Sequence, residues 1–68
     1  MSDTIYIEVI DQHSKFEGKL GKIVDVFDYC GIMIIELFEE NKIIFLDEKQ
    51  YRIICVDEYL WRVYYGNV

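Results

Sequence analysis

The residue types that could carry out catalysis stand in this sequence without the neighbours that catalysis requires. His13 is the only histidine, and the hydroxyl next to it belongs to Ser14. Nucleophilic catalysis needs a Ser or Cys held against a base that a third group orients, and two adjacent residues of a polar loop do not supply that geometry. The thirteen carboxylates could form an acid–base pair, but a solvated acidic surface is the more common arrangement. We therefore predict that the protein is not an enzyme.

The two cysteines, Cys30 and Cys55, lie far apart and lack the spacing of a metal or redox motif. Reduced thiols behave as small apolar side chains, so we expect both cysteines to be packed in the interior. A tetrahedral zinc site needs four N or S ligands, and two cysteines with one histidine cannot provide them. The sequence therefore predicts neither a metal nor a cofactor.

Length and composition predict one folded domain over residues 1–68. The chain has 68 residues, of which 53% are hydrophobic and 16% aromatic, and its net charge is -6. This composition is far from that of disordered chains. There is no run of roughly 20 apolar residues that would span a bilayer, and the first residues lack the pattern of a signal peptide. We therefore expect a cytoplasmic protein without membrane contact.

The one basic segment is a candidate nucleic-acid site. Lys15, Lys19 and Lys22 could contact phosphates, and Phe16 could stack on a base. The opposing interpretation is that the lysines make a loop soluble and pair with nearby acids, and the negative net charge favours it. Both interpretations remain open at this stage.

The C-terminal segment, residues 57–68, is a candidate protein-binding surface. Trp, Tyr and Arg are the residue types most enriched at interface hot spots, and a chain this short cannot bury all of its apolar side chains. The alternative is that the segment closes one end of the fold and buries its own apolar side. The residues that we assign to this surface are Tyr59, Trp61, Arg62, Tyr64 and Tyr65.

The acidic surface is a further candidate for protein binding. Glu39 and Glu40 are adjacent carboxylates in a predicted turn. Clustered carboxylates can imitate nucleic-acid phosphates and occupy a basic groove of another protein, as small acidic phage proteins do. A solvated acidic face is the alternative.

Period-two alternation of apolar residues predicts five strands. In the second strand we expect Val24 and Val26 on one face, with Ile23, Asp25 and Phe27 on the other. The predicted strands are residues 5–10, 22–28, 32–38, 42–46 and 50–56.

Three glycines and one asparagine are expected to make the turns between these strands. Gly18 and Gly31 allow sharp returns, Gly21 allows close backbone approach, and Asn41 tolerates a left-handed conformation. After the fifth strand, the pattern is compatible with a short helix capped by Asp57 and with a sixth strand, and it does not decide between them.

Residues 16–24, with the sequence Phe-Glu-Gly-Lys-Leu-Gly-Lys-Ile-Val, resemble the loop and second strand of KOW-type modules. The resemblance extends over about residues 5–54 and implies an all-β fold, a small SH3-like barrel of five or six short antiparallel strands. Known KOW modules bind RNA or other proteins in ribosomes and transcription complexes. Those that bind RNA are usually basic, whereas this chain is acidic.

The sequence therefore predicts a small acidic binding module that acts through protein–protein interaction, as a regulator or an inhibitor. The alternative is a KOW-like module that binds RNA or DNA through its lysine loop. An apolar, aromatic chain of this kind is also compatible with a homodimer.

Overall fold

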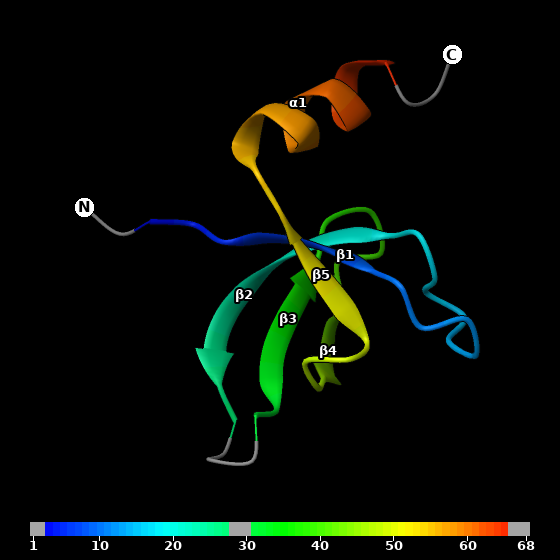
Figure 1. The fold of residues 1–68 in the computed structure, drawn as a ribbon, viewed down its shortest axis with the longest axis vertical. Coiled ribbons are helices and arrows are strands. Elements are labelled where there is room, and N and C mark those ends of the chain that lie inside the picture. The colour runs from blue at the N-terminus through cyan, green and yellow to red at the C-terminus, as the bar shows by residue number, and fades with distance from the viewer. Residues whose placement is uncertain (1–2, 28–30, 66–68) are drawn as a thin grey trace.

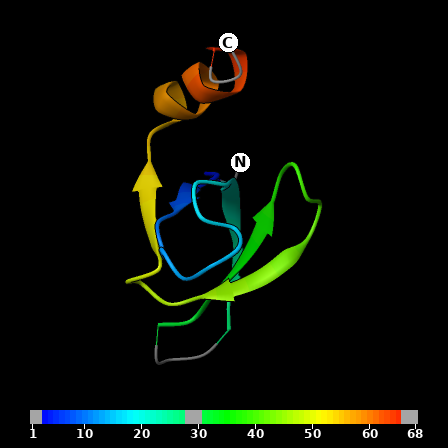
Figure 2. The same ribbon diagram turned by 90° about the vertical axis from the view of Figure 1, so that its right-hand side faces the viewer.

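The computed structural model describes residues 3–27 and 31–65, which form one antiparallel sheet followed by one helix (Figure 1). The strands follow the order β4-β3-β2-β1-β5 across the sheet. The sheet is strongly curved (Figure 2), but β4 and β5 at its two ends are not hydrogen-bonded to each other. The elements are β1 (Tyr6–Val9), β2 (Leu20–Val26), β3 (Met33–Leu37), β4 (Ile43–Leu46), β5 (Tyr51–Ile54) and α1 (Val56–Tyr65).

These elements confirm the expectation of a small all-β domain, because each predicted strand overlaps an observed one. Four observed strands are shorter than the predicted runs, because the first or last residues of those runs do not pair with a neighbouring strand, whereas β2 begins at Leu20, two residues before the predicted start. The segment after β5 is a helix and not a sixth strand. The tyrosine and tryptophan content of this segment favoured a strand, but as a helix the segment places Tyr59 and Arg62 on the side that contacts the sheet.

The core lies on the concave face of the sheet and consists of alternate residues of the strands. Ile7 and Val9 of β1 are fully buried, as are Ile35 and Leu37 of β3. Leu46, Tyr51 and the partly buried Phe16 complete this cluster. Successive side chains of a strand point to opposite faces, so the period-two pattern of the sequence is the physical origin of this core.

A β-bulge in β2 makes the predicted facing of that strand wrong. Ile23 lies opposite Ile35, whereas Asp25 lies opposite Ile34, so the register shifts by one residue between them. Since Ile34 and Ile35 point to opposite faces, Ile23 and Asp25 do as well. A bulge inserts one residue into a strand and reverses the alternation after it, and the local sequence does not signal it.

Two of the predicted turn glycines do what the sequence predicts. Gly18 has a φ of 82°, in the region that glycine adopts without steric cost. Gly21 lies where β2 passes β3, and a Cβ atom there would lie 2.7 Å from the backbone oxygen of Glu36.

The remaining turns behave as expected where the structure describes them. Asn41 has a φ of 54° and closes the hairpin between β3 and β4, and Gly31 has a φ of 92°. Cys30, which we expected to be packed in the interior, lies outside the described residues.

The N-cap residue of helix α1 is Cys55 and not the predicted Asp57. The Glu58 N–H lies 3.4 Å from the Cys55 Sγ atom, and the Tyr59 N–H donates to the Cys55 carbonyl oxygen at 3.0 Å. Cys55 therefore occupies the N-cap position, and its side chain is exposed instead of packed. Asp57 lies in the first turn, where its negative charge interacts favourably with the positive end of the helix dipole.

Candidate functional site

The main unexplained feature of the surface is the apolar face of α1, which we define as Val56, Leu60, Trp61, Tyr64 and Tyr65. None of the ten residues of α1, all of which the structure describes, is buried. Trp61 is 62% exposed and Tyr64 is 73% exposed. Val56, Leu60 and Tyr64 form a ridge with a spacing of four residues, beside the Trp61–Tyr65 pair whose ring centroids lie 5.6 Å apart. Residues three or four apart share one side of a helix, so these side chains form one surface, with the exposed Asp57 of the first turn beside Leu60 and Trp61.

The opposite side of α1 is attached to the sheet by an aromatic cluster. The Tyr59 ring stacks on the Tyr6 ring of β1, with centroids 4.2 Å apart and an interplanar angle of 10°. Phe38, directly after β3, contacts both rings, with its centroid 5.2 Å from that of Tyr59 and 6.0 Å from that of Tyr6. Offset stacked and tilted rings attract each other beyond their burial of area. The cluster therefore fixes the middle of the helix over the sheet.

A network of four charges makes a second attachment on the same side. Arg62 reaches Glu8 of β1 at 3.1 Å and Glu58 of its own helix at 3.2 Å. Arg52 of β5 reaches the same two carboxylates, each at 2.7 Å. The network therefore has no net charge. Glu8 and Glu58 each contact both arginines, one from β5 and one from α1.

The pKa of Glu8 reflects this network. Partial burial alone would raise the pKa of the Glu8 carboxyl, but hydrogen bonds and charges from Arg62 and Arg52 outweigh burial and hold its pKa below the ordinary value. The pKa of Arg52 is raised, chiefly by its hydrogen bond to Glu58. These shifts favour the charged forms of Glu8 and Arg52, which are the forms that make the ion pairs between helix and sheet.

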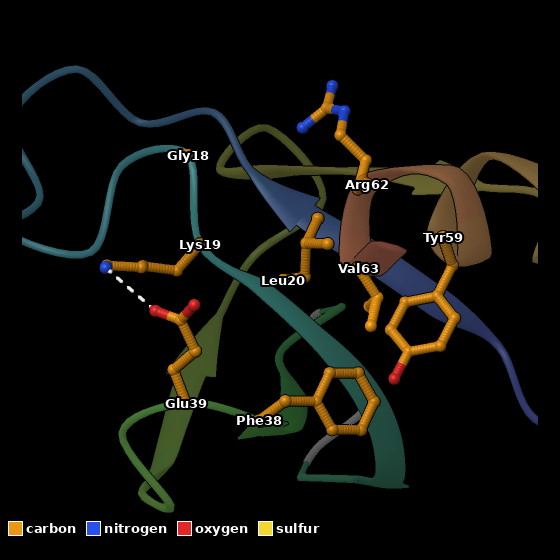
Figure 3. Close-up of a pocket in the computed structure, with 8 residues that line it drawn as sticks. All are labelled: Gly18, Lys19, Leu20, Phe38, Glu39, Tyr59, Arg62 and Val63. Atoms are coloured by element: carbon orange, nitrogen blue, oxygen red, sulfur yellow. Dashed lines mark hydrogen bonds and ion pairs between the residues drawn. The ribbon is translucent and has the colours of Figure 1, made fainter. Parts of the chain in front are cut away.

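A cavity of about 400 Å³ lies where α1 meets the start of β2 and the turn after β3 (Figure 3). Leu20, Phe38, Tyr59 and Val63 gather at one end of it. At the other end Lys19 reaches toward Glu39 at 3.3 Å. The cavity therefore has an apolar end and a polar end, and Arg62 of α1 also lines it.

The structure separates the residues that the sequence assigned to one protein-binding surface. Trp61, Tyr64 and Tyr65 lie on the apolar face of α1 and are exposed. Tyr59 and Arg62 point to the sheet and attach the helix. Glu39 lines the polar end of the cavity, and Glu39 and Glu40 both pair with Lys19.

Two of the three lysines of the predicted nucleic-acid site are engaged by carboxylates. Lys19 lies 3.3 Å from Glu39 and 3.2 Å from Glu40, and these partners raise its pKa. Lys22 lies 3.6 Å from Glu36, its cross-strand neighbour. Lys15 instead lies 5.3 Å from the centroid of the Phe16 ring, and Lys42 approaches the same ring at 5.9 Å.

The polar loop that contains His13 and Ser14 is a structural turn. The His13 N–H donates to Asp11 Oδ1 at 3.0 Å, and the Ser14 Oγ atom accepts the Phe16 N–H at 3.0 Å. The Ser14 hydroxyl thus supports the backbone of the loop, and the His13 side chain is on the surface.

Sequence reasoning missed most of the groups that attach the helix. The Glu58–Arg62 pair was recognisable, since residues four apart on a helix are neighbours. Tyr6, Glu8 and Arg52 were not, because their proximity to α1 depends on the sheet register and on the direction in which the helix leaves β5.

Comparison with protein-family models, with curated proteins and with solved structures finds no match to this chain. Within the part of the chain that the structure describes, no helix has the length and apolar character needed to cross a membrane.

Proposed function

We propose that the protein is a non-catalytic binding module, built on an SH3-like barrel, that recognises another protein through the apolar face of α1. The strand order supports the SH3-like assignment: β2, β3 and β4 form a meander, and β5 returns to pair with β1. The curved sheet and its one-sided aliphatic core also support it, as does the glycine-containing segment that opens β2 in the manner of a KOW-type module.

The observation that carries the functional proposal is that α1 is firmly attached on one side and apolar on the other. A helix of ten residues is marginal in isolation, so the contacts of Tyr59 and Arg62 are what maintain it. Those contacts keep the apolar face turned away from the sheet. A contiguous exposed patch of aromatic and aliphatic side chains on a small soluble domain is typical of an interaction surface.

The charges of the molecule indicate the chemistry of the partner. The four-charge network beside the helix is balanced, and the net charge of -6 arises elsewhere on the domain. A partner that fits would carry an apolar groove for Trp61 and Tyr64, with basic residues at its rim that face the acidic sheet. Complementary charge at the rim would speed association. Such a module would act as a regulator or inhibitor by occupying its partner's groove.

The experiment is an affinity capture from cell lysate with the tagged full chain, with and without nuclease treatment. Trp61→Ala is the test variant, because a side chain that is 62% exposed contributes little to folding. Phe45→Ala is the matched control, since Phe45 is an aromatic residue 56% exposed on β4. We expect a protein partner that survives nuclease, is lost with Trp61→Ala and is retained with Phe45→Ala. A partner captured equally by both variants would contradict the assignment of the surface.

A nucleic-acid function is the second candidate, and the pair of lysines at Phe16 favours it. Lys15 and Lys42 both approach that ring, and a base that stacked there would meet two positive charges. The carboxylate partners of Lys19 and Lys22 weaken this candidate. In the capture experiment, loss of all partners after nuclease, together with recovered RNA or DNA, would favour it over the protein-binding proposal.

A further inference from the structure

The free edge of β4 is a second apolar surface, separate from α1. Leu37 of β3 donates its N–H to the carbonyl oxygen of Lys42 at 2.8 Å. In an antiparallel pair, alternate residues point their N–H and C=O groups toward the partner strand. Lys42, Ile44 and Leu46 therefore face β3, while Ile43 and Phe45 direct their backbone groups away from it. In the described part of the chain no strand pairs with this edge.

The side chains of the same two residues are exposed on the convex face of the sheet. Ile43 is 55% exposed and Phe45 is 56% exposed. The Phe27 ring, also exposed, packs against the Phe45 ring with centroids 4.9 Å apart. An apolar patch thus lies directly beside a row of unpaired backbone groups.

Natural proteins usually protect such an edge with a charge, a proline, a bulge or a covering segment. From Ile43 to Leu46, β4 is entirely apolar, it contains no proline, and its pairing with β3 is regular. Among the residues that the structure describes, the shortness of β4 is the one such protection of this edge. The other edge, β5, differs because it carries Arg52 and continues directly into α1.

We propose that two copies of this chain associate through β4, with the strands antiparallel about a two-fold axis at Ile44. In that register, Ile43 of one copy lies opposite Phe45 of the other, and the reverse pair follows by symmetry. Within each pair, Ile43 and Phe45 exchange two backbone hydrogen bonds, because their N–H and C=O groups point away from β3 and toward the other copy. The two sheets then form one continuous sheet across the dimer.

The side chains and charges of the edge suit a second copy. Ile43 and Phe45 of opposite copies become cross-strand neighbours on the convex face, and pairs of aromatic and β-branched residues stabilise a sheet. From Ile43 to Leu46 this edge carries no charged side chain, so no like charges are brought opposite each other within the paired strands. The self-complementarity of this edge is the reason to assign it to a second copy and not to a different protein.

The available area indicates a reversible dimer. Phe27, Ile43 and Phe45 are each more than half exposed, which leaves roughly 100 Å² on each side chain if a whole aromatic side chain offers 150–250 Å². With the strand backbone and adjoining turns, two copies would bury about 1,000 Å², the lower end for specific interfaces. The charge of -6 per copy opposes association, so salt should strengthen the dimer by screening.

This proposal goes beyond the protein-binding function and uses a different surface, so each can fail alone. The test is sedimentation equilibrium of the full chain over a range of concentrations, together with amide exchange by NMR. We expect a monomer–dimer equilibrium in which the Ile43 and Phe45 amides exchange rapidly when dilute and gain at least tenfold protection when concentrated. A wild-type protein that stays monomeric at the highest concentration would overturn the proposal.

Two variants and one control identify the surface. Ile43→Pro removes an N–H that points away from β3, so it spares the ladder within one copy, and Phe45→Lys places a charge on the edge. Tyr64→Lys makes the same type of change on α1. We expect Ile43→Pro and Phe45→Lys to be folded monomers and Tyr64→Lys to remain dimeric. A dimer that persists in Phe45→Lys, or one that Tyr64→Lys abolishes, would place the contact elsewhere and refute the β4 pairing.

Discussion

Removing the Tyr59 ring should release α1 from the sheet without unfolding the sheet. Tyr59 contacts Tyr6 and Phe38, and each aromatic pair contributes about 0.5–1.5 kcal/mol. Tyr59→Ala therefore removes about 1–3 kcal/mol of attachment from these two contacts. The core contains no residue of α1, so the loss should be local.

Tyr64→Ala is the matched control for this experiment. It makes the same substitution in the same helix, at a residue that is 73% exposed. Alanine has a higher helix propensity than tyrosine, and this gain is common to both variants. The difference between the two variants therefore isolates the contribution of the aromatic cluster.

Native-state amide exchange measured residue by residue gives the readout. A loss of about 1–3 kcal/mol corresponds to roughly 5- to 150-fold lower protection of the α1 amides. We expect that loss in Tyr59→Ala, with the amides of β1 and β3 unchanged, and no loss in Tyr64→Ala. Equal behaviour of the two variants, or an equal loss in helix and sheet, would refute the conclusion that the cluster attaches a separate helix.

Two further predictions concern the sheet and the charge network. Gly21→Ala should lower the stability by about 1–3 kcal/mol, because its Cβ atom would lie 2.7 Å from the Glu36 backbone oxygen; an unchanged melting temperature in circular dichroism would contradict this close approach. Acid should destabilise the protein through Glu8, whose pKa Arg62 and Arg52 hold below its ordinary value against the opposing effect of burial. The unfolded chain takes up that proton at a higher pH than the folded one, so the stabilisation is complete above the ordinary pKa and is lost as the pH falls through the folded pKa. Glu8→Gln should flatten the dependence of the melting temperature on pH in this acidic range, and an unaltered profile would exclude Glu8 as its source.

Local patterns in the sequence predicted most of the sheet. The alternation of Ile7 and Val9 with polar neighbours is sufficient to define β1, because strand geometry alone assigns these side chains to one face. Gly18 and Asn41 marked the turns, since few other residues adopt a positive φ at low cost. The close approach of a neighbouring backbone to Gly21 was also predictable, because a glycine within a strand often marks such an approach.

The facing of β2 could not be predicted, because the bulge after Ile23 depends on how β2 and β3 fit together. The N-cap at Cys55 was missed for a similar reason. Cysteine is not among the preferred N-cap residues, and the position of the cap was set by where β5 ends.

By itself, the sequence determined the strands, two of the turns and the acidic character of the protein, because these follow from local geometry and composition. Only the tertiary structure decided that the last segment is a helix and that Tyr59 and Arg62 attach it while Trp61 and Tyr64 face solvent. A single helix can bury only the side that meets its support. Which side of the helix that is depends on where Tyr6 and Glu8 lie on β1. Glu8 precedes its partner Arg62 by 54 residues in the chain. The exposed edge of β4 likewise follows from the order of the strands, which no local pattern specifies.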